Sequence, residues 1–180
     1  MSRLTIPSLD QSPAASRPLL EAVQGQLGVV PNLFRLVGTS PAALEGFLGL
    51  FGALGKTLDV KTRERIALAT AEANGCDYCL SAHNYLALNL AKLTDAEIEA
   101  ARHGRSSDAH AAAAVGFAAK VAAQRGMVSD DDVRAVRAAG YSDAQIVEIV
   151  LNVALNFLTN LVNNVCQTDI DFPVIRAKAA

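Results

Sequence analysis

Apolar residues recur every three or four positions through most of the chain, which is the spacing of one face of an α-helix. The longest such run extends over about 142–166. Patterns of alternating β-branched residues, typical of strands, are poor, and alanine is abundant. We therefore predict an all-α chain in a single-domain helical bundle of about eight or nine helices. We expect an irregular extension over 1–15, one helical domain over 16–175 and a tail over 176–180.

Capping residues predict where the helices begin and end. Ser16 can cap the first helix, and Ser40 before Pro41 combines a cap with a proline at the first helical position. The capping-box pattern occurs at Thr94–Glu97 and at Ser142–Gln145. Besides a short apolar segment opened by Pro31, the expected helices span about 16–27, 41–55, 60–74, 76–90, 94–104, 108–125, 130–139 and 142–166.

Composition excludes several classes of protein. Hydrophobic residues make up 51% of the 180 residues and charged residues 19%, so a packed core is expected rather than disorder. The mean hydropathy of +0.24 favours either an apolar interface between subunits or simply a rich supply of alanine. The net charge of −2 comes without a basic stripe, which argues against nucleic-acid binding.

The N-terminal residues lack the apolar core of a signal peptide. The most apolar window, 146–162, carries Glu148 and three asparagines, so we expect no membrane span. A cytoplasmic location follows as the expectation. Because thiols there are usually reduced, a cysteine pair is expected to be catalytic or metal-binding.

Two of the three cysteines and one of the three histidines lie in the stretch "CDYCLSAH". A helix turns about 100° per residue, so Cys76, Cys79 and His83 fall in one narrow arc over two turns. Cysteines at i and i+3 near a helix start can form a disulfide, and the helix N-terminus favours a thiolate. The imidazole one turn further can accept the thiol proton and then hold the anion.

The same residues leave other interpretations open. Two thiolates and an imidazole could coordinate zinc, which is bound by four ligands or by three ligands and a water. A second Cys-x-x-Cys or a histidine pair that would complete such a set is missing from the sequence. Coincidence is the third reading. A base beside a thiol needs a partner that orients it, and either Glu64 or Glu72 could serve. Spacing alone does not choose between the two, since Asn74-Gly75 is expected to break the helix.

The stretch "ERIALATAEANGCDYCLSAH" resembles the core motif of the alkylhydroperoxidase D-like proteins, in the carboxymuconolactone decarboxylase superfamily. A glutamate twelve residues before a Cys-x-x-Cys-x-x-x-His is the pattern of that family. The "peroxidase-related" branch is the most similar, since "PNLFRLVGTSPAALEGFLGLFGAL" and "LNVALNFLTNLVNN" also look like it. The resemblance covers most of residues 20–175.

The resemblance implies an all-helical fold, a homo-oligomer (dimer, trimer or hexamer) and a thiol peroxidase cycle without flavin, haem or other cofactor. Cys79 would be the peroxidatic thiol, Cys76 the resolving thiol, and Glu64 would complete a proton relay with His83. Peroxide would oxidise Cys79 to a sulfenic acid, which Cys76 would condense to a disulfide. An external dithiol or disulfide reductase would then reset the pair.

One position departs from the best-studied peroxidases of this family, because Tyr78 stands where they have a histidine. Decarboxylases of the superfamily typically lack the cysteine pair. The leading hypothesis is a thiol-dependent (alkyl hydro)peroxidase with Tyr78, Glu72 and Asn160 as possible supporting residues. The alternatives are a zinc-binding or redox-sensing protein without turnover, and decarboxylase-type acid/base chemistry on a small carboxylic acid.

For the remaining cysteine and histidines, we expect no catalytic role. Cys166 lies in an apolar run and is expected to behave as a small buried hydrophobe. His103 is expected near the surface at a helix C-terminus, and His110 has no visible partner. Four asparagines recur every fourth residue in the last helix, either as a polar seam between subunits or as residues that approach the cysteine pocket. They are Asn152, Asn156, Asn160 and Asn164.

Overall fold

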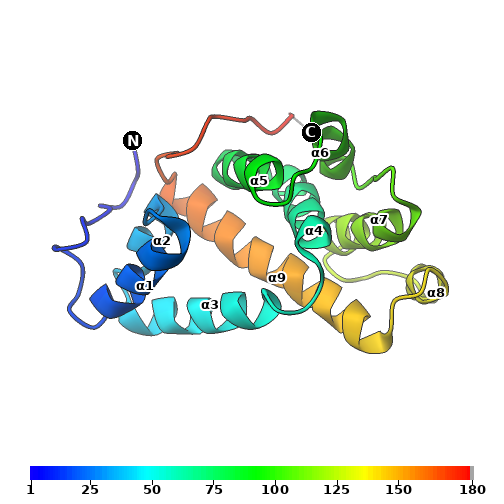
Figure 1. Cartoon of the computed structure of the whole chain (residues 1–180), viewed down its shortest axis with the longest axis horizontal. Coiled ribbons are helices and arrows are strands. Elements are labelled where there is room, and N and C mark those ends of the chain that lie inside the picture. The colour runs from blue at the N-terminus through cyan, green and yellow to red at the C-terminus, as the bar shows by residue number, and fades with distance from the viewer. Residues whose placement is uncertain (179–180) are drawn as a thin grey trace.

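The structure, a computed structural model, describes residues 1–178; Ala179 and Ala180, the end of the expected tail, lie outside the described residues. Within that range the chain forms nine α-helices and no strand, so the predicted fold class is confirmed. The helices pack around α9, which crosses the molecule diagonally (Figure 1). Their bounds are α1 Arg17–Leu27, α2 Asn32–Val37, α3 Pro41–Leu54, α4 Val60–Ala73, α5 Asp77–Asn89, α6 Asp95–Arg102, α7 Ala109–Ala123, α8 Asp130–Ala138 and α9 Asp143–Cys166.

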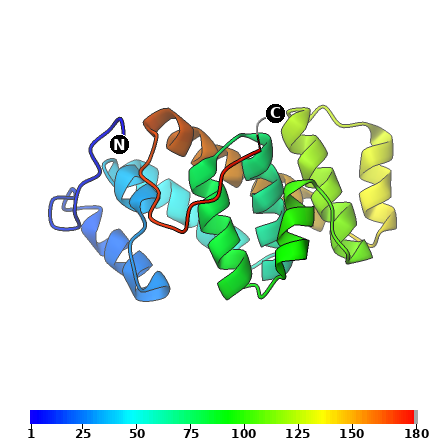
Figure 2. The same ribbon diagram turned by 90° about the horizontal axis from the view of Figure 1, so that it is seen from above.

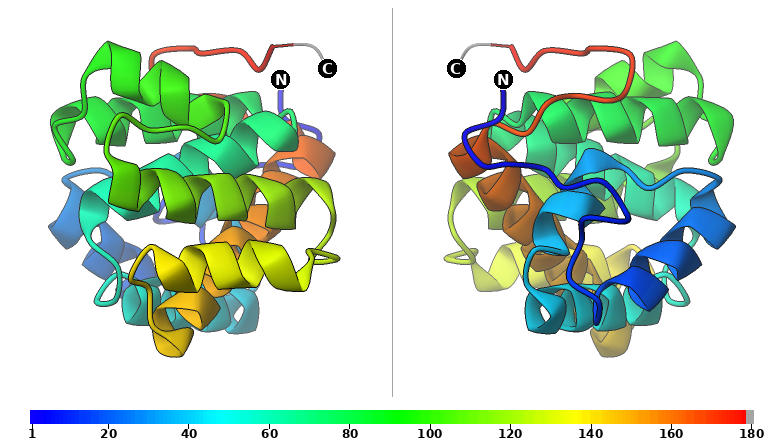
Figure 3. Two further views of the ribbon diagram at one scale, coloured as in Figure 1. Left: turned by 90° about the vertical axis from the view of Figure 1, so that its right-hand side faces the viewer. Right: turned by 90° about the vertical axis from the view of Figure 1, so that its left-hand side faces the viewer.

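The helix α4 lies at the centre of the bundle, because it packs against α5, α6, α7 and α9. The two end views show α7 and α8 at one end of the molecule and α1 and α2 at the other (Figure 3). Polar side chains of α4 are buried as well as apolar ones, among them Glu64 and Arg65. Arg65 Nε donates to Glu97 Oε1 of α6 over 2.8 Å, which compensates both buried charges.

The turn between α4 and α5 places the cysteines. The N–H of Gly75 donates to Glu72 O over 3.1 Å, and that of Cys76 donates to Ala71 O over 2.9 Å, so both bonds close the end of α4. Gly75 has a φ of 59°, a left-handed conformation that glycine adopts without steric cost. The predicted break at Asn74-Gly75 is therefore confirmed, and α5 packs back against α4.

The capping predictions had different outcomes. The capping box at Ser142–Gln145 forms in both directions. At Thr94 the box is incomplete: Thr94 Oγ1 accepts from the N–H of Glu97, but the Glu97 carboxylate binds Arg65 and two serines instead of reaching back. The prediction there was wrong because a buried arginine is a stronger partner for the carboxylate than an exposed backbone N–H.

The prediction for Ser16 was also wrong. Its hydroxyl makes no cap bond to α1 and instead donates to Gly38 O at the end of α2, over 2.7 Å. This bond ties the first two helices together.

Both ends of the described chain lie against the start of α5 and the end of α9. Residues 1–15 contain no helix, and the N-terminal ammonium of Met1 lies 3.2 Å from Asp169 Oδ1. After α9 the chain runs without helix along α5, and we call 169–178 the C-terminal segment (Figure 2). Its backbone is held by side chains of the helices, since the N–H of Ile175 donates to Ser81 Oγ over 2.9 Å and that of Ala177 to Asp77 Oδ1 over 2.9 Å.

Within residues 1–178, α9 is the one helix long and apolar enough to cross a membrane by length and composition. In the fold it packs against α4, α7, α3 and α5, and its buried positions include four asparagines. One side of α9 is therefore packed against the other helices of the bundle.

Candidate functional site

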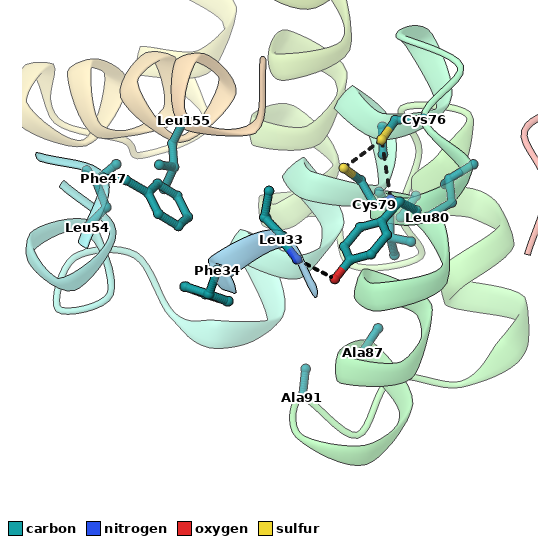
Figure 4. Close-up of a cluster of buried hydrophobic side chains, with 14 of the residues drawn as sticks. Leu33, Phe34, Phe47, Leu54, Cys76, Cys79, Leu80, Ala87, Ala91 and Leu155 are labelled. Carbon is teal, nitrogen blue, oxygen red and sulfur yellow. Dashed lines mark hydrogen bonds between the residues drawn. The ribbon is translucent and has the colours of Figure 1, made fainter. Parts of the chain in front are cut away.

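The cysteine pair lies at the start of α5. Cys76 is the N-cap residue, and its Sγ accepts from the N–H of Cys79 over 3.3 Å. The two Sγ atoms lie 2.7 Å apart, and neither cysteine is in a disulfide (Figure 4). Cys76 is 0% exposed and Cys79 3%. The pair is therefore placed to form a disulfide without a movement of the backbone.

His83 lies one turn beyond Cys79 on α5, and its Nδ1 is 2.8 Å from Glu64 Oε2 on α4. Of the two candidate partners, the structure thus brings Glu64 to the histidine. Glu72 instead accepts from Arg102 Nε over 2.6 Å and from the N–H of Lys178 over 2.7 Å, so it holds other parts of the fold together.

An asparagine that the sequence analysis missed touches the reactive sulfur. Asn163 of α9 is 3% exposed, and its Nδ2 donates to Cys79 Sγ over 3.2 Å. The expected supporting residue Asn160 is fully buried, and its Oδ1 accepts from Asn74 Nδ2 over 2.8 Å.

A spacing of four residues advances about 40° beyond one helical turn, so a stripe drawn every fourth residue drifts away from a fixed face. Asn164, at the end of the predicted stripe, is accordingly exposed, whereas Asn163 stays on the buried face. A period of 3.6 would have found Asn163.

The two thiols differ in acidity. Burial alone would raise the pKa of Cys79, but the hydrogen bonds from Cys76 and Asn163 and the charge of His83 outweigh it and lower that pKa to about 7. The hydrogen bond to Cys79, with burial next, raises the pKa of the Cys76 thiol. Near neutral pH, Cys79 is therefore the thiolate of the pair and Cys76 the neutral thiol.

The environment of His83 favours its charged form. Burial works to lower the pKa of His83, but the Glu64 carboxylate, followed by the Cys79 thiolate, raises it above the ordinary value. The imidazolium is thus flanked by two anionic groups, and it can stabilise the thiolate or give up a proton.

Tyr78, the residue between the two cysteines that differs from the family pattern, is buried. Its hydroxyl accepts from the N–H of Leu33 over 3.1 Å, and its ring packs edge-on against Phe172 at a centroid distance of 5.9 Å. Burial raises the pKa of the Tyr78 phenol. The residue therefore works as a buried connection between α5, α2 and the C-terminal segment.

A largely apolar pocket of about 460 Å³ leads to the site, and we call it the apolar pocket. Cys79, His83 and Glu64 form part of its wall, but Cys76 does not. Three phenylalanines of α2 and α3 pack together beside it, with Phe34 and Phe47 5.4 Å apart between ring centroids. The other walls include Leu54, Leu86, Leu155 and Phe172.

The other reactive groups lie apart from this site. Among residues 1–178, no group of three or more His, Cys, Asp and Glu is arranged to hold a metal ion. Cys166 is buried near the end of α9, and His103 is partly exposed beside Glu99, both as expected. The prediction that His110 has no partner was wrong, because its ring stacks on that of Tyr141 with the ring centroids 4.1 Å apart.

Known proteins share this fold and part of this sequence. The model of the carboxymuconolactone decarboxylase family matches residues 41–124. The structure is similar to that of an uncharacterized peroxidase-related protein of Ralstonia eutropha, described as an alkylhydroperoxidase AhpD core, with a TM-score of 0.84, 27% identity and coverage of 94% of this chain and 92% of that chain. For a peroxidase-related protein of Silicibacter sp. the TM-score is 0.81, with 25% identity over 93% and 91% of the two chains.

Two further matches differ in kind, one extending over most of the chain and one over a short segment. The debrominase Bmp8 has the same fold, with a TM-score of 0.74 and 22% identity over 94% of this chain and 91% of that chain. A segment of 45 residues is 49% identical to an uncharacterized protein of Haemophilus influenzae and takes in 24% of this chain and 40% of that protein.

The fold and the site define an all-helical protein with a buried Cys-x-x-Cys centre and an adjoining histidine–carboxylate pair. The chain matches the carboxymuconolactone decarboxylase family over residues 41–124 and has the alkylhydroperoxidase D-like fold of peroxidase-related proteins, so the predicted resemblance is confirmed.

Proposed function

We propose that the protein is a thiol-dependent peroxidase that reduces organic hydroperoxides. The arrangement around Cys79 carries the proposal: a thiol with a pKa of about 7, its sulfur 2.7 Å from that of a second thiol and one helical turn from an ion-paired histidine. A buried thiolate of this kind is a nucleophile at neutral pH, and its neighbour is placed to capture the oxidised product.

In the first step, the Cys79 thiolate attacks the terminal oxygen of the hydroperoxide. The O–O bond breaks, the alkoxide takes a proton from His83 and leaves as an alcohol, and Cys79 becomes a sulfenic acid. Glu64 keeps the ring oriented and charged before this transfer.

In the second step, the sulfur of Cys76 attacks the sulfenic sulfur. The S–S bond forms, and the hydroxide of the sulfenic acid leaves as water with the proton of Cys76. A dithiol or a disulfide reductase then supplies two electrons and two protons to regenerate both thiols. Because Cys76 is neutral near pH 7 and Cys79 is the thiolate, peroxide reacts first at Cys79.

The walls of the apolar pocket favour a substrate with an apolar body. A hydroperoxide with an alkyl or aryl group buries apolar surface against the phenylalanines there, at about 25 cal/mol per Å². Hydrogen peroxide has no such group. We therefore expect cumene hydroperoxide to react faster than hydrogen peroxide.

Thiol titration tests the proposal. The reduced protein has three free cysteines, and one equivalent of cumene hydroperoxide should leave one titratable thiol per chain, with dithiothreitol restoring the other two. Cys79→Ser should consume no hydroperoxide. Cys166→Ser is the matched control, since it removes a cysteine outside the site and should still lose two thiols. No loss of thiol in the wild-type protein would overturn the proposal.

We further propose that the protein works in the cytoplasm and as a homo-oligomer. The reducing conditions of the cytoplasm suit a cycle that needs free thiols. The exposed apolar side chains on one face of α9, among them Val150, Leu158 and Leu161, support self-association.

A further inference from the structure

We propose that the reducing dithiol reaches the disulfide through a second cavity, separate from the apolar pocket, at the N-terminal end of α5 beneath the C-terminal segment. The inference rests on the proposed function and assigns separate entrances to the two substrates: an apolar hydroperoxide on one side and a small polar dithiol on the other.

This second cavity, which we call the polar cavity, has a volume of about 610 Å³. Tyr78 is the one residue that lines both cavities, so the buried tyrosine separates them. The two walls differ in chemistry, because the polar cavity has amides, a hydroxyl and charged groups where the other has phenylalanines and leucines. Its polar side chains include Asp77, Asn163, Asn164, Gln167, Thr168, Asp169 and Arg176.

Two polar groups in this wall have no partner of their own. Asn163 is 3% exposed and Thr168 5%, yet Asn163 Oδ1 and Thr168 Oγ1 make no hydrogen bond in the structure. Buried polar groups are normally hydrogen-bonded, so this wall suits a ligand that carries donors and acceptors. Asn163 also connects the cavity to the reaction, since its Nδ2 donates to Cys79 Sγ.

The chemistry of disulfide reduction directs the incoming thiolate to Cys76. The thiol with the lower pKa is the better leaving group, and in this pair that is Cys79. The thiolate therefore attacks Cys76 Sγ and forms a mixed disulfide, while Cys79 leaves as a thiolate. The second thiol of the reductant then attacks the reductant's other sulfur, the one bonded to Cys76. The reductant becomes a cyclic disulfide and Cys76 leaves. Two electrons and the two protons of the dithiol are transferred to the protein in all.

Access to Cys76 comes from the side of the polar cavity. Cys79 lines the apolar pocket and Cys76 does not, whereas the residues on either side of Cys76, Gly75 and Asp77, both line the polar cavity. Cys76 itself is 0% exposed, so this wall has to open. The C-terminal segment closes it, through bonds from the N–H groups of Ile175 and Ala177 to α5.

A set of tryptophan variants tests the two entrances. Asn164→Trp narrows the polar cavity from α9, and Leu90→Trp narrows the apolar pocket. Ala144→Trp is the control, since it introduces the same side chain at an exposed residue of α9 that lines neither cavity and lies outside the apolar stripe of that helix. For each variant, the disulfide is prepared with diamide, and its reduction by dithiothreitol is followed separately from the oxidation of the reduced protein by cumene hydroperoxide.

We expect Asn164→Trp to slow reduction about tenfold relative to the control and to leave oxidation within about twofold, because exchange depends on access to the attacked sulfur. Leu90→Trp should slow oxidation alone. Equal reduction rates in Asn164→Trp and the control, or slower reduction in Leu90→Trp, would overturn the inference. Since diamide makes the disulfide without peroxide, a failure of the peroxidase proposal appears separately, as wild-type protein that cumene hydroperoxide does not oxidise.

A second variant covers the case in which Asn164→Trp does not fold. Ser81→Ala removes the hydroxyl that accepts from Ile175, so the C-terminal segment is held less firmly and reduction by dithiothreitol should speed up. An unchanged or slower reduction in this variant would count against the inference.

Discussion

Several neighbouring groups together make Cys79 more acidic than an ordinary buried cysteine. Burial raises its pKa, whereas the hydrogen bonds from Cys76 and Asn163 and the charge of His83 lower it. Removing one of these groups should therefore raise the pKa of Cys79 measurably.

Asn163→Leu removes the hydrogen bond to Cys79 Sγ and keeps the number and branching of the side-chain heavy atoms. A hydrogen bond to a charged group contributes about 1.5 kcal/mol, which corresponds to a rise of the Cys79 pKa from about 7 to about 8. The ultraviolet absorbance of the thiolate, followed against pH, gives this value. Asn164→Leu is the control, because the neighbouring residue is exposed and makes no bond to sulfur; an equal rise in both variants would contradict the assignment.

The pair formed by His83 and Glu64 predicts a pH-dependent contribution to stability. The pKa of His83 is raised in the fold, so the charged ring stabilises the folded state fully below its unfolded pKa of about 6.5, and the contribution is lost as the pH rises through the folded value. Glu64→Gln should therefore lower the free energy of unfolding more at pH 6 than at pH 9, in urea titrations at the two values. A difference that is the same at both would show that the ion pair does not contribute.

At the scale of helices, the sequence predicts the elements better than their side-chain partners. Helical spacing and breakers predicted nearly every boundary, because these signals are local. The partners of Glu97 and Ser16 were missed, since each binds a residue distant in sequence. The choice of Glu64 over Glu72 also required the packing of α4 on α5.

The turn that holds the cysteines depends on Gly75. A Cβ there would meet no atom within 4 Å, so the cost of Gly75→Ala comes from its φ of 59° alone, about 1–2 kcal/mol of destabilisation. Gly46→Ala is the matched control, since this exposed glycine lies inside α3 with equally open space, and alanine there should stabilise by about 0.5–1 kcal/mol. Urea unfolding measures both, and effects of the same sign would contradict the argument.

At the scale of the whole molecule, the outer face of α9 is uncovered. Its exposed apolar residues follow the helical period with no charged residue among them, and such a stripe normally packs against another surface. A second copy of this chain would supply the same stripe, which agrees with the mean hydropathy of +0.24. The residues are Val147, Val150, Leu151, Leu158, Leu161 and Val165.

Light scattering tests self-association. The wild-type protein should have a mass that is a multiple of the 18.9 kDa chain, and Leu161→Lys should reduce it by placing a charge in the stripe. Met127→Lys, at an exposed position away from α9, should leave the mass unchanged. If the wild-type protein had the mass of a single chain, the proposed self-association through α9 would be wrong.

Met1 and Arg176 share the wall of the polar cavity, and the ammonium of Met1 pairs with Asp169. An affinity tag joined directly to Met1 would therefore begin beside the route proposed for the reductant and replace this ion pair. Reduction rates measured on protein tagged there would include the effect of the tag. Kinetic work on this protein accordingly calls for a preparation from which such a tag has been cleaved.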